Sequence, residues 1–308
     1  MKISILGAGN VGSLTAMRLA QLSLGDILLV DVLKGLALGK ALDLEDARGT
    51  LRLDYNVKGT DNISSIVDSD IVVITAGLSR KPGMTREDLL LKNSQILKSL
   101  SKSIKSFAEN AIIIVVTNPL DLMTYFVLKE SGFKKNKVFG MGISLDAARF
   151  ANIISRELTI PIEEINPVVI GPHGEGMLPL PRHTKIAGIN FLTLAGEEKA
   201  ELIVNKTVNR GAEIVSALGS GSAFFAPSAA IADLVSSIAL DRKMVTGVSA
   251  YLEGEYKVNG VCLGVPCRIG RGGIEEIIEL DLNKEESERF FLSAESISNL
   301  LKGLPCMT

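Results

Sequence analysis

The amino-acid sequence predicts an α/β protein, with a doubly wound parallel sheet in its first half and an α+β domain in its second half. Two observations predict this fold class. Between residues 2 and 131, short apolar segments of strand length alternate with longer segments of helical periodicity. From about residue 142 onwards this alternation stops, and long helical segments and consecutive β-rich segments follow. Alternation of strand and helix indicates a parallel sheet with helices on both faces, whereas the second pattern is typical of α+β domains.

The individual elements follow from these patterns in chain order. In the first half we expect strands over residues 2–6, 27–31, 71–75 and 111–117, an extended segment over 56–59, and helices over 11–23, 35–47, 86–109 and 120–131. In the second half we expect helices over 144–158, 196–218, 225–240 and 284–302, and antiparallel strands within 245–271. Asn283 is a suitable N-cap for the last helix. We place the domain boundary near Gly142, which divides the chain into residues 1–142 and 143–308.

The composition argues against several classes of partner. The chain has 308 residues and a net charge of −2, with no run of Lys and Arg, so we expect no nucleic-acid binding. The mean hydropathy of +0.30 is high. No apolar stretch approaches the ~20 residues that span a bilayer, so we expect no membrane insertion. The surplus apolar side chains are expected in the core and in subunit interfaces, which favours an oligomer.

The start of the chain and the cysteines indicate a cytoplasmic location. The first strand begins at Lys2, which leaves no room for a signal or transit peptide. Cys262, Cys267 and Cys306 have no metal-ligand spacing, and the first two lie on what the pattern predicts to be a pair of strands. We expect these cysteines to be reduced, buried and unreactive, and we expect no metal site.

A glycine-rich turn follows the first strand and opens the first helix. It consists of Gly7, Ala8, Gly9, Asn10, Val11 and Gly12, and it matches the G-x-G-x-x-G fingerprint of Rossmann-type domains. Gly7 would make the tight turn, Gly9 would let a pyrophosphate approach the backbone, and Gly12 would let the helix pack on the strand. The N–H groups at the start of the helix would then face the phosphates. Alone, the motif is weak evidence.

Asp31 strengthens the prediction of a dinucleotide site. It ends the second expected strand, 19 residues after Gly12, where an acid would hydrogen-bond both ribose hydroxyls. A carboxylate there would also repel a 2′-phosphate, so NAD is favoured over NADP. Lys34 leaves some tolerance for NADP. The alternative is that Asp31 is only a turn or helix-capping acid.

A cationic loop follows the strand expected over residues 71–75. Residues 77–86 read G-L-S-R-K-P-G-M-T-R and carry Arg80, Lys81 and Arg86. Two glycines and a proline indicate a mobile loop. Cations on such a loop, at the end of a strand, suggest a lid that closes over a small anion. The alternative is a solvated surface loop with ordinary charges.

Polar residues in three other places are candidates for chemistry. His173 lies in a loop rich in glycine and proline, and imidazole readily exchanges a proton at neutral pH. Asp146 and Arg149 are i and i+3 on an expected helix, so they project from one face. They could form a local ion pair, or Asp146 could orient a histidine while Arg149 binds a substrate carboxylate. Asn118 follows an expected strand, at the edge of the sheet where ligands of such folds bind.

Together these segments resemble the lactate/malate dehydrogenase family, specifically its malate dehydrogenases of the lactate-dehydrogenase-like type. The resemblance covers essentially the whole chain. It rests on G-A-G-N-V-G at 7–12, R-K-P-G-M-T-R at 80–86, T-N-P-L-D at 117–121, L-D-A-A-R-F at 145–150, H-G-E-G-M-L-P-L at 173–180 and Y-L-E-G-E-Y at 251–256. Several ordered motifs at family-like spacing are far more specific than any one of them.

The resemblance implies reversible, NAD-dependent oxidation of (S)-malate to oxaloacetate by hydride transfer to nicotinamide. His173 would accept the hydroxyl proton, and Asp146 would stabilise the resulting imidazolium. Arg149 would bind the C1 carboxylate, Arg86 would polarise the C2 carbonyl, and Asn118 would contact both substrate and cofactor. The other implied cofactor contacts are the six residues from Gly7 to Gly12, Asp31, Asn93, Val116 and Thr117.

Arg80 distinguishes substrates within the family that the chain resembles. Lactate dehydrogenases carry glutamine at the matching position, whereas arginine can pair with the second carboxylate of malate or oxaloacetate. A charge-assisted hydrogen bond contributes ~1.5–3 kcal/mol, so discrimination of ~10³-fold against pyruvate is expected.

One departure from the family pattern lies beside the implied catalytic histidine. The family usually reads H-G-D-T, whereas this chain reads His173-Gly174-Glu175-Gly176.

The resemblance also implies a homotetramer built as a dimer of dimers, and a role in the tricarboxylic acid cycle. Three alternatives stay open: an L-lactate or broad 2-hydroxy-acid dehydrogenase, an NAD-dependent glycosidase of related fold, and a non-catalytic NAD-binding sensor. The glycosidases are longer and use a metal with Cys and His ligands, and the middle of this sequence contains no such cluster.

Overall fold

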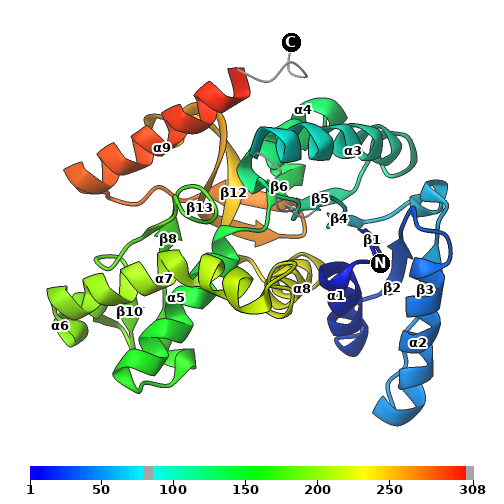
Figure 1. The fold of residues 1–308 in the computed structure, drawn as a ribbon, viewed down its shortest axis with the longest axis horizontal. Helices are drawn as coiled ribbons and strands as arrows, with labels where there is room; N and C mark the ends of the chain where they lie inside the picture. The colour runs from blue at the N-terminus through cyan, green and yellow to red at the C-terminus, as the bar shows by residue number, and fades with distance from the viewer. Residues whose placement is uncertain (79–85, 303–308) are drawn as a thin grey trace. The chain divides into compact units, whose positions relative to one another are not determined.

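The computed structural model describes residues 1–78 and 86–302, with only the backbone described for residues 86–88. Arg80 and Cys306 lie outside the described residues. The chain folds into two compact units (Figure 1). The first consists of Met1–Met141, Phe224–Met244 and Ile269–Glu275, and the second of Gly142–Ala223, Val245–Arg268 and the segment that begins at Glu276. The chain therefore changes unit more than once, and a single domain boundary at residue 142 remains a proposal.

Among the described residues of the first unit, six parallel strands lie side by side in one sheet, in the order β6-β5-β4-β1-β2-β3. They are β1 (Lys2–Leu6), β2 (Asp26–Val30), β3 (Val57–Thr60), β4 (Ile71–Ile74), β5 (Ile112–Val115) and β6 (Val138–Gly140). Most of their side chains are Val, Ile or Leu and are buried, because helices cover both faces of such a sheet.

The register of these strands brings several chain segments to one edge of the sheet. Leu6, at the end of β1, pairs with Val30 on one side and with Ile74 on the other. Ile74 in turn pairs with Val115. The order of the strands reverses at β1, and ligands of doubly wound sheets bind beyond the carboxyl ends of the strands at such a point.

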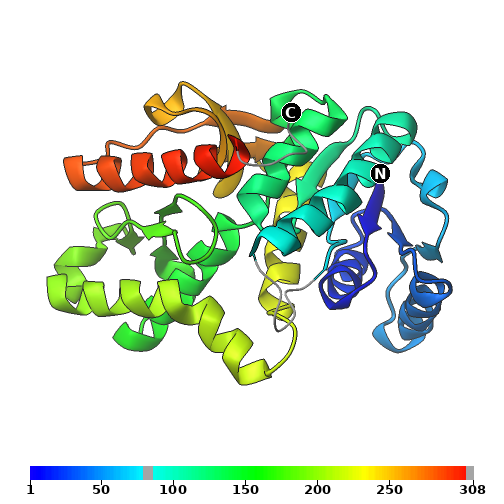
Figure 2. The ribbon, with the colours of Figure 1, turned by 45° about the horizontal axis from the view of Figure 1, so that its top comes forward.

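The described part of the first unit contains five α-helices: α1 (Asn10–Gln21), α2 (Leu36–Leu51), α3 (Arg86–Phe107), α4 (Leu120–Ser131) and α8 (Phe225–Ala239). Helix α2 packs on β3, α3 packs on α4, and α8 packs on α1. Figures 1 and 2 both show α8, in yellow, beside α1, in blue. A hydrogen bond of 3.0 Å from Arg18 Nε to Ser228 Oγ joins these two helices.

The second unit has its own core, which lies around α5 (Ile143–Leu158) and α7 (Glu197–Leu218). The rings of Phe150, on α5, and Phe191, on α6 (Phe191–Ala195), meet edge to face with centroids 5.8 Å apart. Two small antiparallel sheets lie in this unit. One contains β7 (Ile165–Asn166), β10 (Lys185–Ile186) and β11 (Ile189–Asn190), and the other contains β8 (Val169–Ile170) and β9 (Leu178–Pro179).

Three longer strands and a helix follow in the described part of the chain: β12 (Met244–Glu253), β13 (Asn259–Gly270), β14 (Gly273–Ile277) and α9 (Lys284–Lys302). The expected N-cap of α9 is confirmed, because Asn283 Oδ1 accepts from the Glu286 amide at 2.9 Å. The carboxylate of Glu286 accepts from the Asn283 amide at 2.8 Å in return. This reciprocal pair is a capping box, which fixes where α9 begins.

The expected fold class is confirmed, and most expected elements are present within a few residues of their predicted bounds. The three-residue strand β6 was not anticipated. The two cysteines were expected on a pair of strands, whereas Cys262 and Cys267 both lie on β13. Both are buried and reduced, and burial raises the pKa of the Cys267 thiol.

Two kinds of feature are absent from the described residues. In residues 1–78 and 86–302, no helix is long and apolar enough to cross a membrane. The same residues contain no cluster of three or more His, Cys, Asp or Glu side chains with the geometry of a metal site.

Candidate active site

The glycine-rich turn after β1 has the close contacts that its sequence predicts. Gly7 has a φ of +106°, and a Cβ on it would lie 2.7 Å from the Ala76 nitrogen. A Cβ on Gly12 would lie only 1.9 Å from the Gly7 carbonyl oxygen, so the start of α1 packs directly on the turn. At Gly9, by contrast, no heavy atom lies within 4 Å of the Cβ position. The turn therefore has open space at Gly9, which fits a pyrophosphate that approaches the backbone.

Asp31 lies beside this turn. Its Oδ2 accepts from the Ala8 amide at 2.7 Å, and its Oδ1 accepts from the Leu33 amide at 2.9 Å. These two bonds hold the carboxylate next to the glycine-rich turn and leave acceptor capacity on both oxygens. A carboxylate held in this way is suited to receive hydrogen bonds from the two hydroxyls of a ribose.

Asn93 connects the segments that follow β4 and β5. Its side chain is fully buried; Oδ1 accepts from the Leu78 amide at 2.8 Å, and Nδ2 donates to the Asn118 carbonyl at 2.8 Å. Thr117 joins the same two segments by donating from Oγ1 to the Ala76 carbonyl at 2.6 Å. The side chain of Asn93 therefore braces these segments, and any contact with the cofactor would be additional to that role.

Asn118 and Val116 border this braced region. Asn118 is exposed and Val116 is half-buried, and the Val116 amide donates to the Ile74 carbonyl at 2.9 Å. Both follow β5 at the carboxyl edge of the sheet, where a bound ligand would meet them.

In the second unit, the structure brings Asp146, Arg149 and His173 together. Asp146 lies in the first turn of α5 and has no exposed surface. Its Oδ2 is 2.7 Å from His173 Nδ1, and its Oδ1 accepts from Arg149 Nη1 at 3.0 Å. The sequence left open an ion pair or an Asp–His pair, and both are present. Because the carboxylate is an acceptor, Nδ1 of His173 carries the proton in this contact, so Nε2 is the basic nitrogen of the neutral ring.

The loop that carries His173 is held at both of its ends. Strands β8 and β9 pair on either side of it, with Ile170 opposite Leu178. Gly171 exchanges two backbone hydrogen bonds with Gly264, of 2.8 and 3.0 Å. The Gly174 amide also points to Asp146 Oδ2, at 3.4 Å. These contacts fix the imidazole relative to α5.

Arg149 has a buried donor that makes no hydrogen bond to any part of the chain that the structure describes. Its Nε is shielded from solvent and lacks a partner, whereas Nη1 is engaged by Asp146. The side chain is 11% exposed. A buried donor without an acceptor is costly, so an anionic ligand that accepts from this guanidinium would remove that cost.

The remaining site predictions concern Arg80 and Arg86, and α3 begins at Arg86. Arg80 lies outside the described residues, and the side chain of Arg86 is not described.

Two residues near the cofactor turn were not anticipated. Thr75 Oγ1 donates to the Gly7 carbonyl at 2.9 Å, and Lys40 Nζ donates to the Ala8 carbonyl at 2.6 Å. Thr75 was detectable as a polar residue at the end of a buried strand, whereas nothing in the local sequence marks Lys40.

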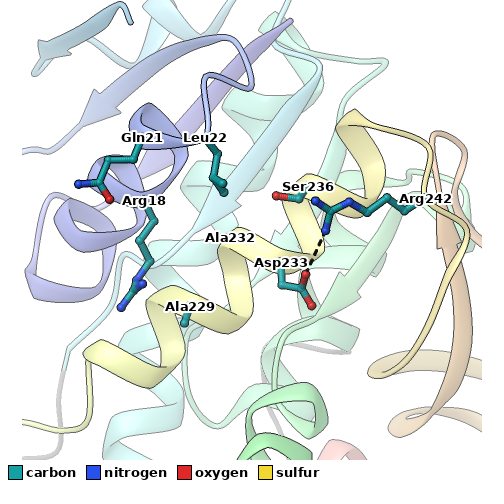
Figure 3. A pocket seen from close by; sticks show the side chains of 8 residues that line it. All are labelled: Arg18, Gln21, Leu22, Ala229, Ala232, Asp233, Ser236 and Arg242. Atoms are coloured by element: carbon teal, nitrogen blue, oxygen red, sulfur yellow. Dashed lines mark hydrogen bonds and ion pairs between the residues drawn. The ribbon is translucent and has the colours of Figure 1, made fainter. Parts of the chain in front are cut away.

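A groove of about 310 Å³ lies elsewhere in the first unit (Figure 3). It is lined by Arg18, Gln21 and Leu22 near the end of α1, by Ala229, Ala232, Asp233 and Ser236 of α8, and by Arg242. A rise of ~1.5 Å per residue places this end of α1 on the order of 10 Å or more from Gly12. The groove is therefore distinct from the cofactor turn.

The fold and the site define a dinucleotide-binding protein that also carries a buried Asp–His pair. The chain belongs to the lactate/malate dehydrogenase family. Residues 1–140 match the model of the lactate/malate dehydrogenase NAD binding domain, and residues 143–304 match that of the alpha/beta C-terminal domain. The first unit thus contains the NAD-binding domain of this family, and NAD is its cofactor.

Several relatives are similar over nearly their whole length. The malate dehydrogenase of Methanosarcina barkeri is 46% identical over 303 residues, which cover 98% of this chain and 99% of the relative. The apo structure of the malate dehydrogenase from Picrophilus torridus is 42% identical, with a TM-score of 0.93 over 97% of this chain and 95% of that chain. A lactate dehydrogenase from Cryptosporidium parvum, complexed with lactic acid and nicotinamide adenine dinucleotide, is 34% identical, with a TM-score of 0.94 over 99% and 98% of the two chains.

Proposed function

We propose that this protein catalyses the reversible, NAD-dependent oxidation of (S)-malate to oxaloacetate. The observation that carries the proposal is the contact of 2.7 Å between the buried Asp146 carboxylate and His173 Nδ1. It occurs in a chain that is 45–48% identical to malate dehydrogenases over nearly its whole length. A buried carboxylate that holds an imidazole by one nitrogen leaves the other to exchange a proton with a substrate.

His173 is the proposed proton acceptor. The hydroxyl proton of malate moves to His173 Nε2, while Asp146 stabilises the imidazolium that forms. NAD supplies the hydride acceptor for C2 when it is bound. In the reverse direction His173 returns the proton to the oxygen of oxaloacetate. The full burial of Asp146 supports this role, because its charge acts on the imidazole with little screening from solvent.

Arg149 is the proposed ligand of the substrate C1 carboxylate. A guanidinium presents paired donors that match the two oxygens of a carboxylate. The unpartnered, buried Nε of Arg149 supports this role, because a carboxylate would satisfy it. Arg86 is proposed to polarise the C2 carbonyl, and Asn118 to contact substrate and cofactor. These two roles rest on the family resemblance.

NAD is the proposed cofactor in preference to NADP. Asp31 supports this preference, because its carboxylate is fixed beside the glycine-rich turn and would repel a 2′-phosphate. Asn93, Val116 and Thr117 remain proposed cofactor contacts. Measurement of kcat/KM with NADH and with NADPH would test the preference, and equal values would contradict it.

The alternative activity is oxidation of L-lactate or of a broad range of 2-hydroxy acids. Lactate dehydrogenases are among the similar structures, at 34% and 37% identity and with TM-scores of 0.94 and 0.95. Arg80, which is proposed to pair with the second carboxylate of malate, separates the two activities. Its proposed role follows from the family resemblance of the motif at residues 80–86.

Steady-state kinetics with oxaloacetate and with pyruvate test the substrate directly. We expect kcat/KM to be at least ~10³-fold higher for oxaloacetate, because pyruvate would leave the Arg80 charge unpaired. The Arg80→Gln variant should shift the ratio towards pyruvate by orders of magnitude. Equal values for the two substrates in the parent protein would refute malate as the substrate. An unchanged ratio in the variant would refute the role of Arg80.

We further propose a cytoplasmic homotetramer, built as a dimer of dimers, that acts in the tricarboxylic acid cycle. Apolar side chains on the outer face of α2 support contacts with other copies, since Leu38 and Leu42 are 50% and 51% exposed. Size-exclusion chromatography with light scattering would measure the mass. A monomeric mass at micromolar concentration would contradict the tetramer.

A further inference from the structure

Lys40 makes a contact that the proposed reaction does not use. Its Nζ donates to the Ala8 carbonyl at 2.6 Å, in the middle of the glycine-rich turn. Ser13 Oγ donates to the same carbonyl at 3.0 Å. The amide of Ala8 is bound as well, because it donates to Asp31 Oδ2 at 2.7 Å. Both backbone polar groups of Ala8 are therefore held by charged side chains of opposite sign.

The packing of α2 explains why Lys40 reaches the turn. Ala37 and Ala41 are the buried residues of this helix, and Lys40 lies next to them in its second turn. A Cβ on Gly59, in β3, would lie 2.1 Å from the Ala37 carbonyl oxygen, so the helix approaches the strand closely. The start of α2 is thereby fixed against the sheet, and the half-buried side chain of Lys40 extends from it to Ala8.

We propose that Lys40 is a positioning residue of the cofactor site, which holds the glycine-rich turn in the conformation that binds the dinucleotide. The proposal rests on the cofactor role proposed for Gly7 to Gly12 and Asp31. Lys40 fixes the turn from α2, whereas Asp31 fixes it from the end of β2. Asp31 contacts the amide of Ala8, and Lys40 contacts its carbonyl.

Two physical effects give Lys40 this role. A charge-assisted hydrogen bond is stronger than a neutral one, and the Ala8 carbonyl receives it directly. Asp31 and Lys40 hold the two successive peptide groups on either side of the Ala8 Cα, so this bond completes the fixation of the turn at Ala8. In addition, the ammonium places a positive charge beside a turn that is proposed to receive a negatively charged pyrophosphate.

The experiment compares Lys40→Met with Lys40→Arg and with a control, Lys58→Met. Lys58 is an exposed lysine on the neighbouring strand β3, so its variant removes the same charge without touching the turn. NADH binding can be followed by the fluorescence of NADH, and the chain contains no tryptophan that would interfere. Asp31→Ala serves as the reference for the cofactor site itself.

We expect Lys40→Met to weaken NADH binding about tenfold, which is the loss of a charge-assisted hydrogen bond. The KM for NADH should rise in parallel, while kcat at saturating NADH stays within about twofold, because the turn does not take part in the chemical step. Lys40→Arg should recover most of the affinity, and Lys58→Met should bind NADH as the parent does. If Lys40→Met does not fold, Lys40→Gln provides the same comparison.

Three results would overturn the proposal. Unchanged NADH binding in Lys40→Met, together with a loss in Asp31→Ala, would show that Lys40 has no role at a correctly identified site. Unchanged binding in both variants would show that the cofactor site itself is wrongly assigned. A loss of kcat without a change in NADH affinity would show that Lys40 acts elsewhere in the reaction.

Discussion

The steric fit between Pro172 and Gly176 gives a sharp prediction about the loop that carries His173. A Cβ on Gly176 would lie 2.6 Å from Pro172 Cγ, although the φ of Gly176 is outside the left-handed region. Glycine is therefore required there by space and not by backbone conformation. This is the position at which the family usually has threonine. Gly176→Ala is the smallest change that tests the fit.

The size of the effect follows from the contact distance. The added methyl and the proline ring must separate from 2.6 Å to an ordinary contact of about 3.4 Å, a shift of about 0.8 Å. Pro172 immediately precedes His173, so a shift of Pro172 displaces the imidazole. A misplacement of ~1 Å in a catalytic group costs up to ~10²-fold in rate. We expect kcat/KM for oxaloacetate to fall roughly 10- to 100-fold, with a loss of stability of only about 1 kcal/mol, because the site is exposed.

A double-mutant cycle measures this fit directly. The Pro172→Ala/Gly176→Ala variant removes the ring carbon that the new methyl would meet, so it should recover most of the activity that Gly176→Ala loses. Gly49→Ala is the matched control, because a Cβ there, on α2, has no heavy atom within 4 Å. A Gly176→Ala enzyme within twofold of the parent would refute the reasoning. Additive losses in the double variant would also refute it, since the two positions would then not be coupled.

Two further predictions concern Asp146 and Glu286. Asp146→Asn should lower kcat by about 10³- to 10⁴-fold in steady-state assays, because an amide no longer fixes the tautomer of His173; a loss under tenfold would contradict the role of Asp146. Burial raises the pKa of Glu286, but hydrogen bonds from Arg182 and the Asn283 amide outweigh it and hold the pKa below the usual 4.5. The stabilisation that ionised Glu286 gives to the folded state is therefore present above about pH 4.5. It is lost as the pH falls through the lowered pKa of Glu286 in the folded state. Arg182→Met should have a lower free energy of unfolding in urea than the parent at pH 7, and this difference should become smaller below pH 4. An equal difference in unfolding free energy at both pH values would contradict this linkage.

The sequence was sufficient for those parts of the site that depend on local geometry. The tight turn at Gly7 and the packing at Gly12 follow from where a Cβ would clash, and a motif encodes such constraints within a few residues. The position of Asp31 beside the turn was predictable for a similar reason, because Asp31 directly follows a buried strand next to the turn. The helical spacing of Asp146 and Arg149 likewise predicted that they share a face.

Other features depend on contacts between distant segments, which a single sequence does not reveal. Helix α8 belongs to the first unit because it packs on α1, more than 200 residues earlier in the chain. Asn93 was expected to touch the cofactor, but its bonds to Leu78 and Asn118 show that it also braces two strand ends. The three residues of β6 are too few for a period-2 pattern, so this strand is recognised from its backbone pairing, such as that with β5, and not from the sequence.

The Asp146 carboxylate is shared between Arg149 and His173, which has a consequence for the order of events in the proposed reaction. Arg149 and His173 contact different oxygens of one buried carboxylate, so they compete for a single negative charge. As long as no substrate carboxylate is bound to Arg149, the guanidinium compensates part of the negative charge of Asp146. Less of that charge is then available to stabilise an imidazolium at His173. A substrate carboxylate bound to Arg149 would compensate the guanidinium, and Asp146 would then balance His173 alone. Asp146 would therefore stabilise the imidazolium most fully when a substrate is in place to give up its proton. In the proposed reaction, the i, i+3 ion pair of Asp146 and Arg149 would thus couple substrate binding to the proton acceptor.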